Sequence, residues 1–314
     1  MKILVTGASG FVGQCLIKAL KLKNISFVGI VRQFSHPNFD GMAEVADFSI
    51  PDIWQKPLTH CDIVIHLAAR VHVMREVTEN PLEAFLSVNL HGTLNLAQAA
   101  AKAGVKRFIY VSSIKVNGEY TENKPFSEHD IPNPQDPYAN SKYQTEIKLL
   151  ELAKTTAMEV VIIRPPLVYG AEVKANFLQL MSLVKRSFPL PLACIKNQRS
   201  MIYVGNLVDA IITCATHPKA ANQLYLVSDN ELVSTPQLVR ELAHALGKKS
   251  LVLPFPIFLM KFLAWLFGKS TTVDRLTQSL VIDISKIRKE LDWEPPHTME
   301  QGLIATAEWF KSKE

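Results

Sequence analysis

The 314-residue sequence contains little cysteine and no strong excess of charge of one sign. The spacings of its four cysteines (Cys15, Cys61, Cys194 and Cys214) match neither a zinc site nor a redox motif. We therefore expect no metal site, and reduced thiols in a cytoplasmic protein. The net charge of +5 is not clustered, which argues against a nucleic-acid partner. The apolar run at the N-terminus is too short for a signal peptide.

The sequence also lacks an apolar run long enough to cross a membrane. Residues 251–267 are apolar except for Lys261, but Pro254 and Pro256 interrupt them and Gly268 follows. A spanning helix needs about 20 apolar residues, so we predict no stable membrane span. We expect a helix here that is buried or lines a cleft. A helix that lies on a membrane surface is the alternative.

Short apolar runs alternate with helical patterns through the first half of the chain. Predicted strands are 2–6, 26–31, 62–67, 106–112 and 160–164, with 43–46 a weaker candidate, and predicted helices are 11–22, 82–103 and 138–156. Strands that are apolar throughout indicate a parallel sheet covered on both faces. We predict an α/β fold with a Rossmann-type doubly wound sheet over residues 1–165, to which the chain returns near 200–216. Residues 166–314 should mainly form a smaller C-terminal α/β substrate-binding region.

Three glycines follow the first predicted strand and open the first helix. Gly7, Gly10 and Gly13 are spaced as GxxGxxG, with Phe11 and Val12 between the last two. In such a loop the first glycine permits a tight turn and the second lets the backbone approach a pyrophosphate. The third lets helix and strand pack closely, and the helix N-terminus offers N–H groups to the phosphates. This arrangement predicts a dinucleotide site.

Tyr138 and Lys142 form a candidate catalytic pair. They are four residues apart, so they share one face of the predicted helix. A nearby ammonium stabilises a phenolate, and we expect Lys142 to lower the pKa of Tyr138 in this way. Ser113 ends a predicted strand and can orient a substrate hydroxyl or carbonyl. The three residues predict hydride chemistry at a carbinol or ketone.

The order of the motifs resembles that of the extended short-chain dehydrogenase/reductase family, in its NAD-dependent epimerase/dehydratase group. The shared landmarks are the glycine motif, His66-Leu67-Ala68-Ala69, Asn89, Val111-Ser112-Ser113, Tyr138 with Lys142, and Arg164-Pro165-Pro166. The resemblance implies that Tyr138 is the acid/base, Lys142 its tuner and Ser113 the substrate anchor. It also implies a homodimer through helices 82–103 and 138–156. Implied cofactor contacts, beyond the glycine loop, Tyr138 and Lys142, are Asp47, Phe48, Leu67, Ala68, Ala69, Asn89, Ser112 and Pro165.

The end of the second predicted strand bears on the choice of cofactor. An acidic residue there would bond the adenosine ribose hydroxyls and favour NAD. The sequence instead has Val31-Arg32-Gln33. Arg32 can pair with a 2′-phosphate, which favours NADP. The alternative is a surface arginine beside an NAD site.

The second half of the chain resembles the nucleotide-sugar-binding region of the same family, which implies a UDP-sugar substrate. Arg199 matches an arginine that clamps the diphosphate, as suits a guanidinium that bonds phosphate oxygens in pairs. Arg275 lies near the place of a second such arginine, with a surface arginine as the alternative. Asn176, Phe177 and Leu178 resemble the segment with which members of this family contact the nucleoside diphosphate.

The two residues after Ser113 bear on which reaction of this family the chain catalyses. Dehydratases of this family carry an Asp-Glu pair there, which expels water, but this chain has Ile114 and Lys115. Dehydration is therefore not predicted. We expect Lys115 to face an anionic or carbonyl group of the substrate, or else solvent. Asn117 replaces the tyrosine of galactose epimerases, which argues against simple galactose epimerisation.

The resemblance is strongest to UDP-glucose 4-epimerase-like enzymes of bacterial polysaccharide and O-antigen clusters, some of which are 4-ketoreductases. We therefore expect reduction of a UDP-4-keto-6-deoxy-N-acetylhexosamine at C4 to UDP-N-acetylquinovosamine, in surface polysaccharide biosynthesis. One alternative is a 4-epimerase acting on UDP-glucose or UDP-N-acetylglucosamine. The other is a non-catalytic dinucleotide sensor.

Overall fold

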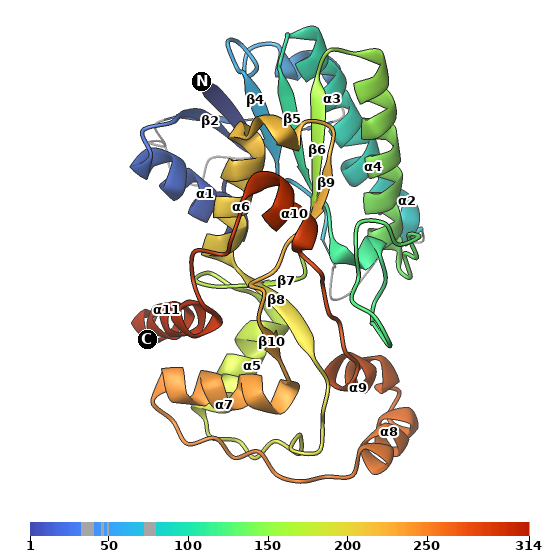
Figure 1. Ribbon diagram of the computed structural model, residues 1–314, viewed down its shortest axis with the longest axis vertical. Helices are drawn as coiled ribbons and strands as arrows, with labels where there is room; N and C mark the ends of the chain where they lie inside the picture. Colours follow the sequence, from blue (N-terminus) through green and yellow to red (C-terminus); the bar gives the residue numbers. More distant parts are fainter. Residues whose placement is uncertain (33–40, 45–46, 49, 72–79, 314) are drawn as a thin grey trace.

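A seven-stranded parallel sheet forms the centre of the molecule in the computed structural model, which describes residues 1–32, 41–44, 47–48, 50–71 and 80–313 (Figure 1). Its strands are β1 (Lys2–Thr6), β2 (Ser26–Val31), β3 (Met42–Glu44), β4 (Ile63–His66), β5 (Arg107–Val111), β6 (Glu159–Arg164) and β9 (Leu224–Leu226). Their order is β3-β2-β1-β4-β5-β6-β9, and neighbouring strands are parallel. The order reverses between β1 and β4, which is the switch point where such sheets bind ligands. The predicted Rossmann-type fold is confirmed.

Helices cover both faces of this sheet. They are α1 (Phe11–Leu22), α2 (Pro81–Leu86), α3 (Thr93–Lys102), α4 (Pro137–Thr155), α6 (Val204–Thr216) and α10 (Ser285–Leu291), with short 3-10 turns at Pro51–Trp54, Ile114–Val116 and Pro218–Ala220. Val5 of β1 lies in one core with Leu16 of α1 and Ile211 of α6. Its neighbour Leu4 lies in the other core with Leu96 of α3. Successive strand residues point to opposite faces, so strands covered on both faces are apolar throughout.

The predicted helix 82–103 is interrupted by a π-helical turn, Ser87–Gly92, between α2 and α3. Within the turn, the buried Asn89 side chain accepts from Arg70 N at 2.7 Å and donates to Ser141 Oγ at 2.9 Å. These partners come from the segment after β4 and from α4. Because they are distant in the sequence, helical periodicity did not reveal the turn. π-helical turns of this kind are frequent at functional sites.

The second region is built on a small sheet of order β10-β8-β7. Its elements are β7 (Leu167–Tyr169), β8 (Arg199–Tyr203), β10 (Leu232–Val233), α5 (Ala175–Lys185), α7 (Thr235–Leu246), α8 (Ile257–Leu266), α9 (Ser270–Thr277) and α11 (Met299–Ser312). Tyr169 of β7, Met181 of α5, Leu242 of α7 and Leu303 of α11 share its core. Between these elements the chain returns to the large sheet through α6, β9 and α10 (Figure 1).

The apolar segment 251–267 contains the expected helix, α8, but the prediction that it is buried was wrong. α8 buries Ala264, whereas Phe258, Trp265 and the following Phe267 are exposed. The helix is apolar on every side and packs against α9 at the edge of the molecule, so most of its surface faces solvent (Figure 1). Within the described ranges, no helix is both long and apolar enough to cross a bilayer.

A buried ion pair joins α4 to β6. Arg164 Nε donates to Glu146 Oε1 at 3.0 Å, and both side chains are under 5% exposed (4% and 3%). Arg164 Nη1 also donates to Asn117 Oδ1 at 2.8 Å, and Asn117 Nδ2 donates to Ser127 O at 2.9 Å. Asn117 therefore fixes the loop after β5 to the ion pair.

Replacing Glu146 with Gln should lower the free energy of unfolding by about 3 kcal/mol or more, because it leaves the Arg164 guanidinium buried without a compensating charge. Urea denaturation of the purified protein measures this. The control is Glu151→Gln, which removes an exposed partner of Lys148 and should cost less than about 1 kcal/mol. Equal losses in the two variants would contradict a structural role for the buried pair.

Candidate active site

The glycine loop lies at the carboxyl end of β1, in close contact with the chain after β4. Gly7 has a φ of +68°, and a Cβ there would lie 2.8 Å from Ala68 N. A Cβ on Gly13 would lie 2.1 Å from the Gly7 carbonyl oxygen. Gly10 is the N-cap of α1 and has no side chain to bond the amides of Phe11 and the residues after it. The loop therefore fits a dinucleotide pyrophosphate, which those amides would bind.

His66 aligns the ends of β1 and β4. Its Nδ1 lies 2.8 Å from Thr6 Oγ1, and its Nε2 lies 2.8 Å from Thr93 Oγ1 at the start of α3. Thr6 Oγ1 also accepts from Ala68 N at 3.2 Å. Burial, aided by the charge of Lys142, lowers the pKa of His66 to about 3, so the ring stays neutral. This network holds the predicted cofactor residues 67–69 beside the glycine loop.

The predicted adenosine contacts lie farther along the same edge of the sheet. Arg32 is exposed directly after β2, and Ala8 N, in the glycine loop, donates to Ile30 O of that strand at 3.3 Å. Asp47 is exposed. The half-buried Phe48 ring packs edge-on against Trp54, with centroids 4.8 Å apart. Gln33 and residues 72–74 of the resembling motifs lie outside the described residues. The cofactor contacts of these side chains remain predictions.

Ser113, Tyr138 and Lys142 come together at the carboxyl end of β5. The Ser113 hydroxyl lies close enough to Tyr138, in the first turn of α4, to lower the pKa of that phenol. One turn later, the buried Lys142 Nζ donates to Val111 O at 2.8 Å. The Ser112 hydroxyl, also buried here, has no hydrogen-bond partner within the described part of the chain. The sequence-predicted catalytic residues are therefore adjacent in space, beside a buried polar group that a ligand could satisfy.

Burial controls the electrostatics of this group. It raises the pKa of Tyr138 to about 12, with a further rise from the Asp136 charge and an opposing effect of the Ser113 hydroxyl. It lowers the pKa of Lys142 to about 7, against the opposing charge of Glu146. Lys142 is not among the groups that shift the tyrosine pKa here, and its ammonium donates to Val111 O, so the predicted lowering by Lys142 is not seen in this structure. Tyr138 is thus held as a neutral phenol, a proton donor.

Lys115 is half-buried and pairs with two carboxylates. Its Nζ lies 2.8 Å from Glu119 Oε1 and 2.6 Å from Asp136 Oδ2. Asp136 is also the N-cap of α4, since its Oδ1 accepts from Ala139 N at 2.7 Å. Sequence reasoning missed both carboxylates. The Asp136-Pro137 pair before an expected helix is an N-cap signal that would have identified the first of them.

The two predicted diphosphate arginines are neighbours. Arg199 Nη1 donates to Arg275 O at 2.9 Å and to Gln278 O at 3.3 Å. Burial lowers the pKa of Arg199, and the nearby Glu119 opposes the shift. Arg275 is exposed and lies close enough to Asp136 for its charge to lower the pKa of that carboxyl. Lys115, Glu119 and Asp136 therefore connect the arginines with the Tyr138 end of the site.

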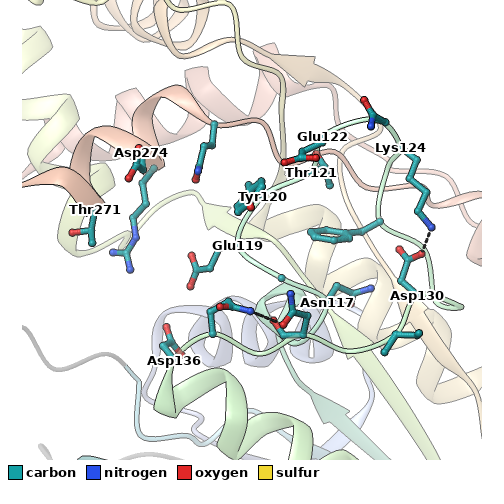
Figure 2. Close-up of a pocket in the computed structure, with 18 of the residues that line it drawn as sticks. Asn117, Glu119, Tyr120, Thr121, Glu122, Lys124, Asp130, Asp136, Thr271 and Asp274 are labelled. Carbon is teal, nitrogen blue, oxygen red and sulfur yellow. Dashed lines mark hydrogen bonds and ion pairs between the residues drawn. The ribbon is translucent and has the colours of Figure 1, made fainter. Parts of the chain in front are cut away.

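A pocket of about 1260 Å³ opens between the loop after β5 and the region of α9. Figure 2 shows Glu119 and Asp136 on one side, with Thr271 and Asp274 on the other. Arg275 and Gln278 also line it. Asp136, the N-cap of the helix that carries Tyr138, lines the pocket, and so does Arg275, which holds Arg199 through its backbone.

Asn176, Phe177 and Leu178 lie near the start of α5. Asn176 is exposed and Leu178 is half-buried. The Phe177 ring stacks on Tyr169 in the core of the second region, with centroids 5.7 Å apart. The part of Phe177 that can contact a ligand is therefore its backbone. Among the described residues, no group of three or more His, Cys, Asp or Glu side chains is placed to hold a metal ion.

The doubly wound sheet, the glycine loop at its switch point and the Ser113–Tyr138–Lys142 group define a Rossmann-fold, dinucleotide-dependent enzyme. The family model described as "NAD dependent epimerase/dehydratase family" matches residues 3–228, more than half of the chain. The chain belongs to this family.

Relatives along the whole chain support this assignment. The chain is 49% identical over 311 residues to a "UDP-glucose 4-epimerase" of Vibrio cholerae, covering 98% of this chain and 95% of the relative. The crystal structure of a UDP-glucose 4-epimerase with UDP-glucose from Thermotoga maritima superposes with a TM-score of 0.80 at 23% identity, covering 100% and 99% of the two chains. That of a Thermus thermophilus UDP-glucose 4-epimerase with NAD has a TM-score of 0.80 at 22% identity, covering 100% of each. The two structures show that the fold is shared.

Acid should destabilise the protein through His66. Its pKa is about 3 in the folded protein and near 6.5 in the unfolded chain, so the unfolded chain binds the proton first. The stabilisation is complete above pH 6.5 and is lost as the pH falls toward 3, by about 1.4 kcal/mol per pH unit.

Urea denaturation between pH 6 and pH 4 tests this. His66→Gln cannot titrate and can still bond both threonines, so its stability should fall less steeply with acid than that of the wild type, by about the same 1.4 kcal/mol per pH unit. The exposed His129→Gln control should keep the wild-type slope. A His66→Gln slope equal to that of the wild type would refute the prediction.

Proposed function

We propose that this chain is an NAD(P)-dependent 4-epimerase of a UDP-hexose, with UDP-glucose and UDP-N-acetylglucosamine as candidate substrates. The observation that carries the proposal is the placement of Ser113 beside Tyr138 and Lys142 at the end of β5, with Ile114 and Lys115 where a dehydratase has its acid pair. This site provides proton transfer at one hydroxyl or carbonyl, and the two positions after Ser113 supply no acid and base to expel water. The name of the Vibrio cholerae relative agrees with this reading.

The residues have distinct roles in this reaction. A bound dinucleotide would supply the hydride acceptor and donor at the end of β5. Ser113 orients the C4 oxygen of the sugar by a hydrogen bond. Tyr138 takes the proton of that oxygen when C4 is oxidised and returns it when the ketone is reduced. Lys142, anchored on Val111 O, stabilises the phenolate that accepts this proton and that forms again when the ketone is reduced.

The diphosphate would bind at the other end of the site. Because Nη1 of Arg199 is held by two backbone carbonyls, its guanidinium is fixed in place, which suits bidentate phosphate binding. Arg275, Asn176 and the chain around Leu178 are the further proposed contacts. Since Lys115 is engaged by Glu119 and Asp136, we propose that it acts on the substrate through these carboxylates, which can accept from sugar hydroxyls.

A second candidate is a 4-ketoreductase that forms UDP-N-acetylquinovosamine for surface polysaccharides. The observation that favours it is Arg32, exposed directly after β2 on the strand that contacts the glycine loop. An arginine in this position suits the 2′-phosphate of NADP. A reductase must exchange its cofactor in every turnover, whereas an epimerase regenerates it on the enzyme.

We also propose a homodimer through α2, α3 and α4. Val88, in the π-helical turn before α3, and Ile147 of α4 are apolar and exposed, as an interface between these helices would require. α2 and α3 both pack on α4 within one chain, so two copies would form a bundle of paired helices.

The decisive experiment uses the protein as purified. With UDP-glucose or UDP-N-acetylglucosamine and no added NADPH, we expect inversion at C4, which chromatography of the nucleotide sugars measures. We also expect the purified protein to retain bound NAD. Stoichiometric NADPH oxidation with a UDP-4-keto-6-deoxy sugar, without C4 inversion, would establish the reductase instead. Failure of both reactions would contradict both candidates.

Tyr138→Phe should lower kcat about a hundredfold or more, because it removes the acid/base group. Binding of the dinucleotide, measured by fluorescence titration, should stay close to that of the wild type. Tyr143→Phe, on the same helix, is the matched control and should keep its activity. Wild-type turnover by Tyr138→Phe would exclude the proposed mechanism.

A further inference from the structure

The surface around α8 is unusually apolar for an exposed helix. Phe258, Trp265 and Phe267 are 75%, 70% and 71% exposed, and Phe262 is 55% exposed. Phe262 and Trp265 lie side by side, with ring centroids 6.2 Å apart. Single exposed apolar residues are common on soluble proteins, but a continuous group of large aromatic residues marks a surface that contacts something else.

Basic side chains lie within α8 and directly after it. Residues 248–269 contain Lys248, Lys249, Lys261 and Lys269 and no acidic residue. All four lysines are exposed. Lys261 lies in the middle of α8 and approaches Asp274 of α9 at 3.6 Å, with half of its side chain still exposed. Lys261 and Lys269 therefore give the α8 surface a charge that complements an anionic surface, whereas Lys248 and Lys249 lie in the loop after α7.

The position and length of α8 restrict what can cover it. The proposed dimer helices α3 and α4 lie at the opposite end of the molecule, so that dimer would leave α8 uncovered (Figure 1). With 10 residues, α8 is about 15 Å long, half of the roughly 30 Å hydrocarbon core of a bilayer. It can lie along a bilayer surface but cannot cross one.

We propose that α8, with Lys261 and Lys269, binds the protein to the surface of a membrane that contains anionic lipids. The aromatic residues enter the boundary between headgroups and acyl chains, and the lysines contact the anionic headgroups. Aromatic and aliphatic side chains flanked by lysine are the composition of helices that bind membranes in this way. Because α8 packs on α9, which lines the pocket, the substrate site then lies next to the bilayer.

Vesicle co-sedimentation of the full-length protein tests the proposal. The protein should bind vesicles of phosphatidylcholine with 30% phosphatidylglycerol, and bind pure phosphatidylcholine much more weakly. Binding should weaken at 0.5 M NaCl, because salt screens the lysines. Trp265→Ser should weaken the partition coefficient about tenfold. The control is Leu22→Ser, an equally exposed apolar residue on α1 (76%), which should bind like the wild type.

The lysines are tested separately. Lys261→Gln with Lys269→Gln should weaken the preference for anionic vesicles, whereas Lys23→Gln, at the end of α1, should not. C4 inversion measured with soluble substrate should be unchanged in these variants and in Trp265→Ser, which separates this proposal from the proposed function. Failure of the wild type to bind either vesicle would overturn the proposal, as would equal binding by Trp265→Ser.

Tryptophan fluorescence gives an independent readout. Trp54 and Trp293 are buried and Trp309 is half-buried, so Trp265 is the tryptophan whose surroundings should change on docking. We expect a blue shift on addition of anionic vesicles, and its loss in Trp265→Phe, which still sediments with them. The proposal would be overturned if the wild type did not bind vesicles and Trp265→Ser changed the oligomeric state measured by light scattering. That result would assign α8 to an interface between proteins.

Discussion

The buried ion pair between Glu146 and Arg164 fixes α4 against the sheet, and the position of the reacting groups depends on it. α4 carries Tyr138 and Lys142 on one face, so a small rotation of the helix would move both. Lys142 is bonded to Val111 O, and Ser141 to Asn89 in the π-helical turn, which prevents such a rotation. Burying two charges costs desolvation free energy, and removing one of them leaves the other without a partner. The pair therefore adds little net stability but holds α4 in one position on the sheet.

The same burial determines the protonation of the site. Desolvation disfavours a charge on either group, which raises the pKa of Tyr138 to about 12 and lowers that of Lys142 to about 7. Near neutral pH the tyrosine keeps its proton and the lysine is close to its midpoint. This state favours proton donation to a ketone oxygen. Oxidation needs the phenolate, and the ammonium one helical turn away is the cation that the chain itself provides for it.

Most of the large sheet could be predicted from the sequence, because buried parallel strands are apolar throughout and the glycine spacing marks the first turn. β1, β2 and α1 have the predicted bounds. The features that were missed depend on tertiary partners. The π-helical turn arises from the contacts of Asn89 with Arg70 and Ser141, and Asp136 meets Lys115 from 21 residues away. The exposure of α8 could not be predicted, because an apolar run has the same composition whether protein, lipid or solvent surrounds it.

The distance between the two ends of the site is fixed by backbone pairing between the regions. In the loop after β5, Thr121 N donates to Ser279 O and Phe126 N to Val281 O, each at 2.8 Å. This loop carries Glu119, and residues 279–281 follow α9, whose backbone holds Arg199. The paired segments therefore connect the part of the pocket that Glu119 and Asp136 line to the part that Arg275 lines. A ligand that reaches both parts must carry a polar reacting centre and an anionic group at a fixed separation. A nucleotide sugar has both groups, whereas a simple ketone has no anionic group.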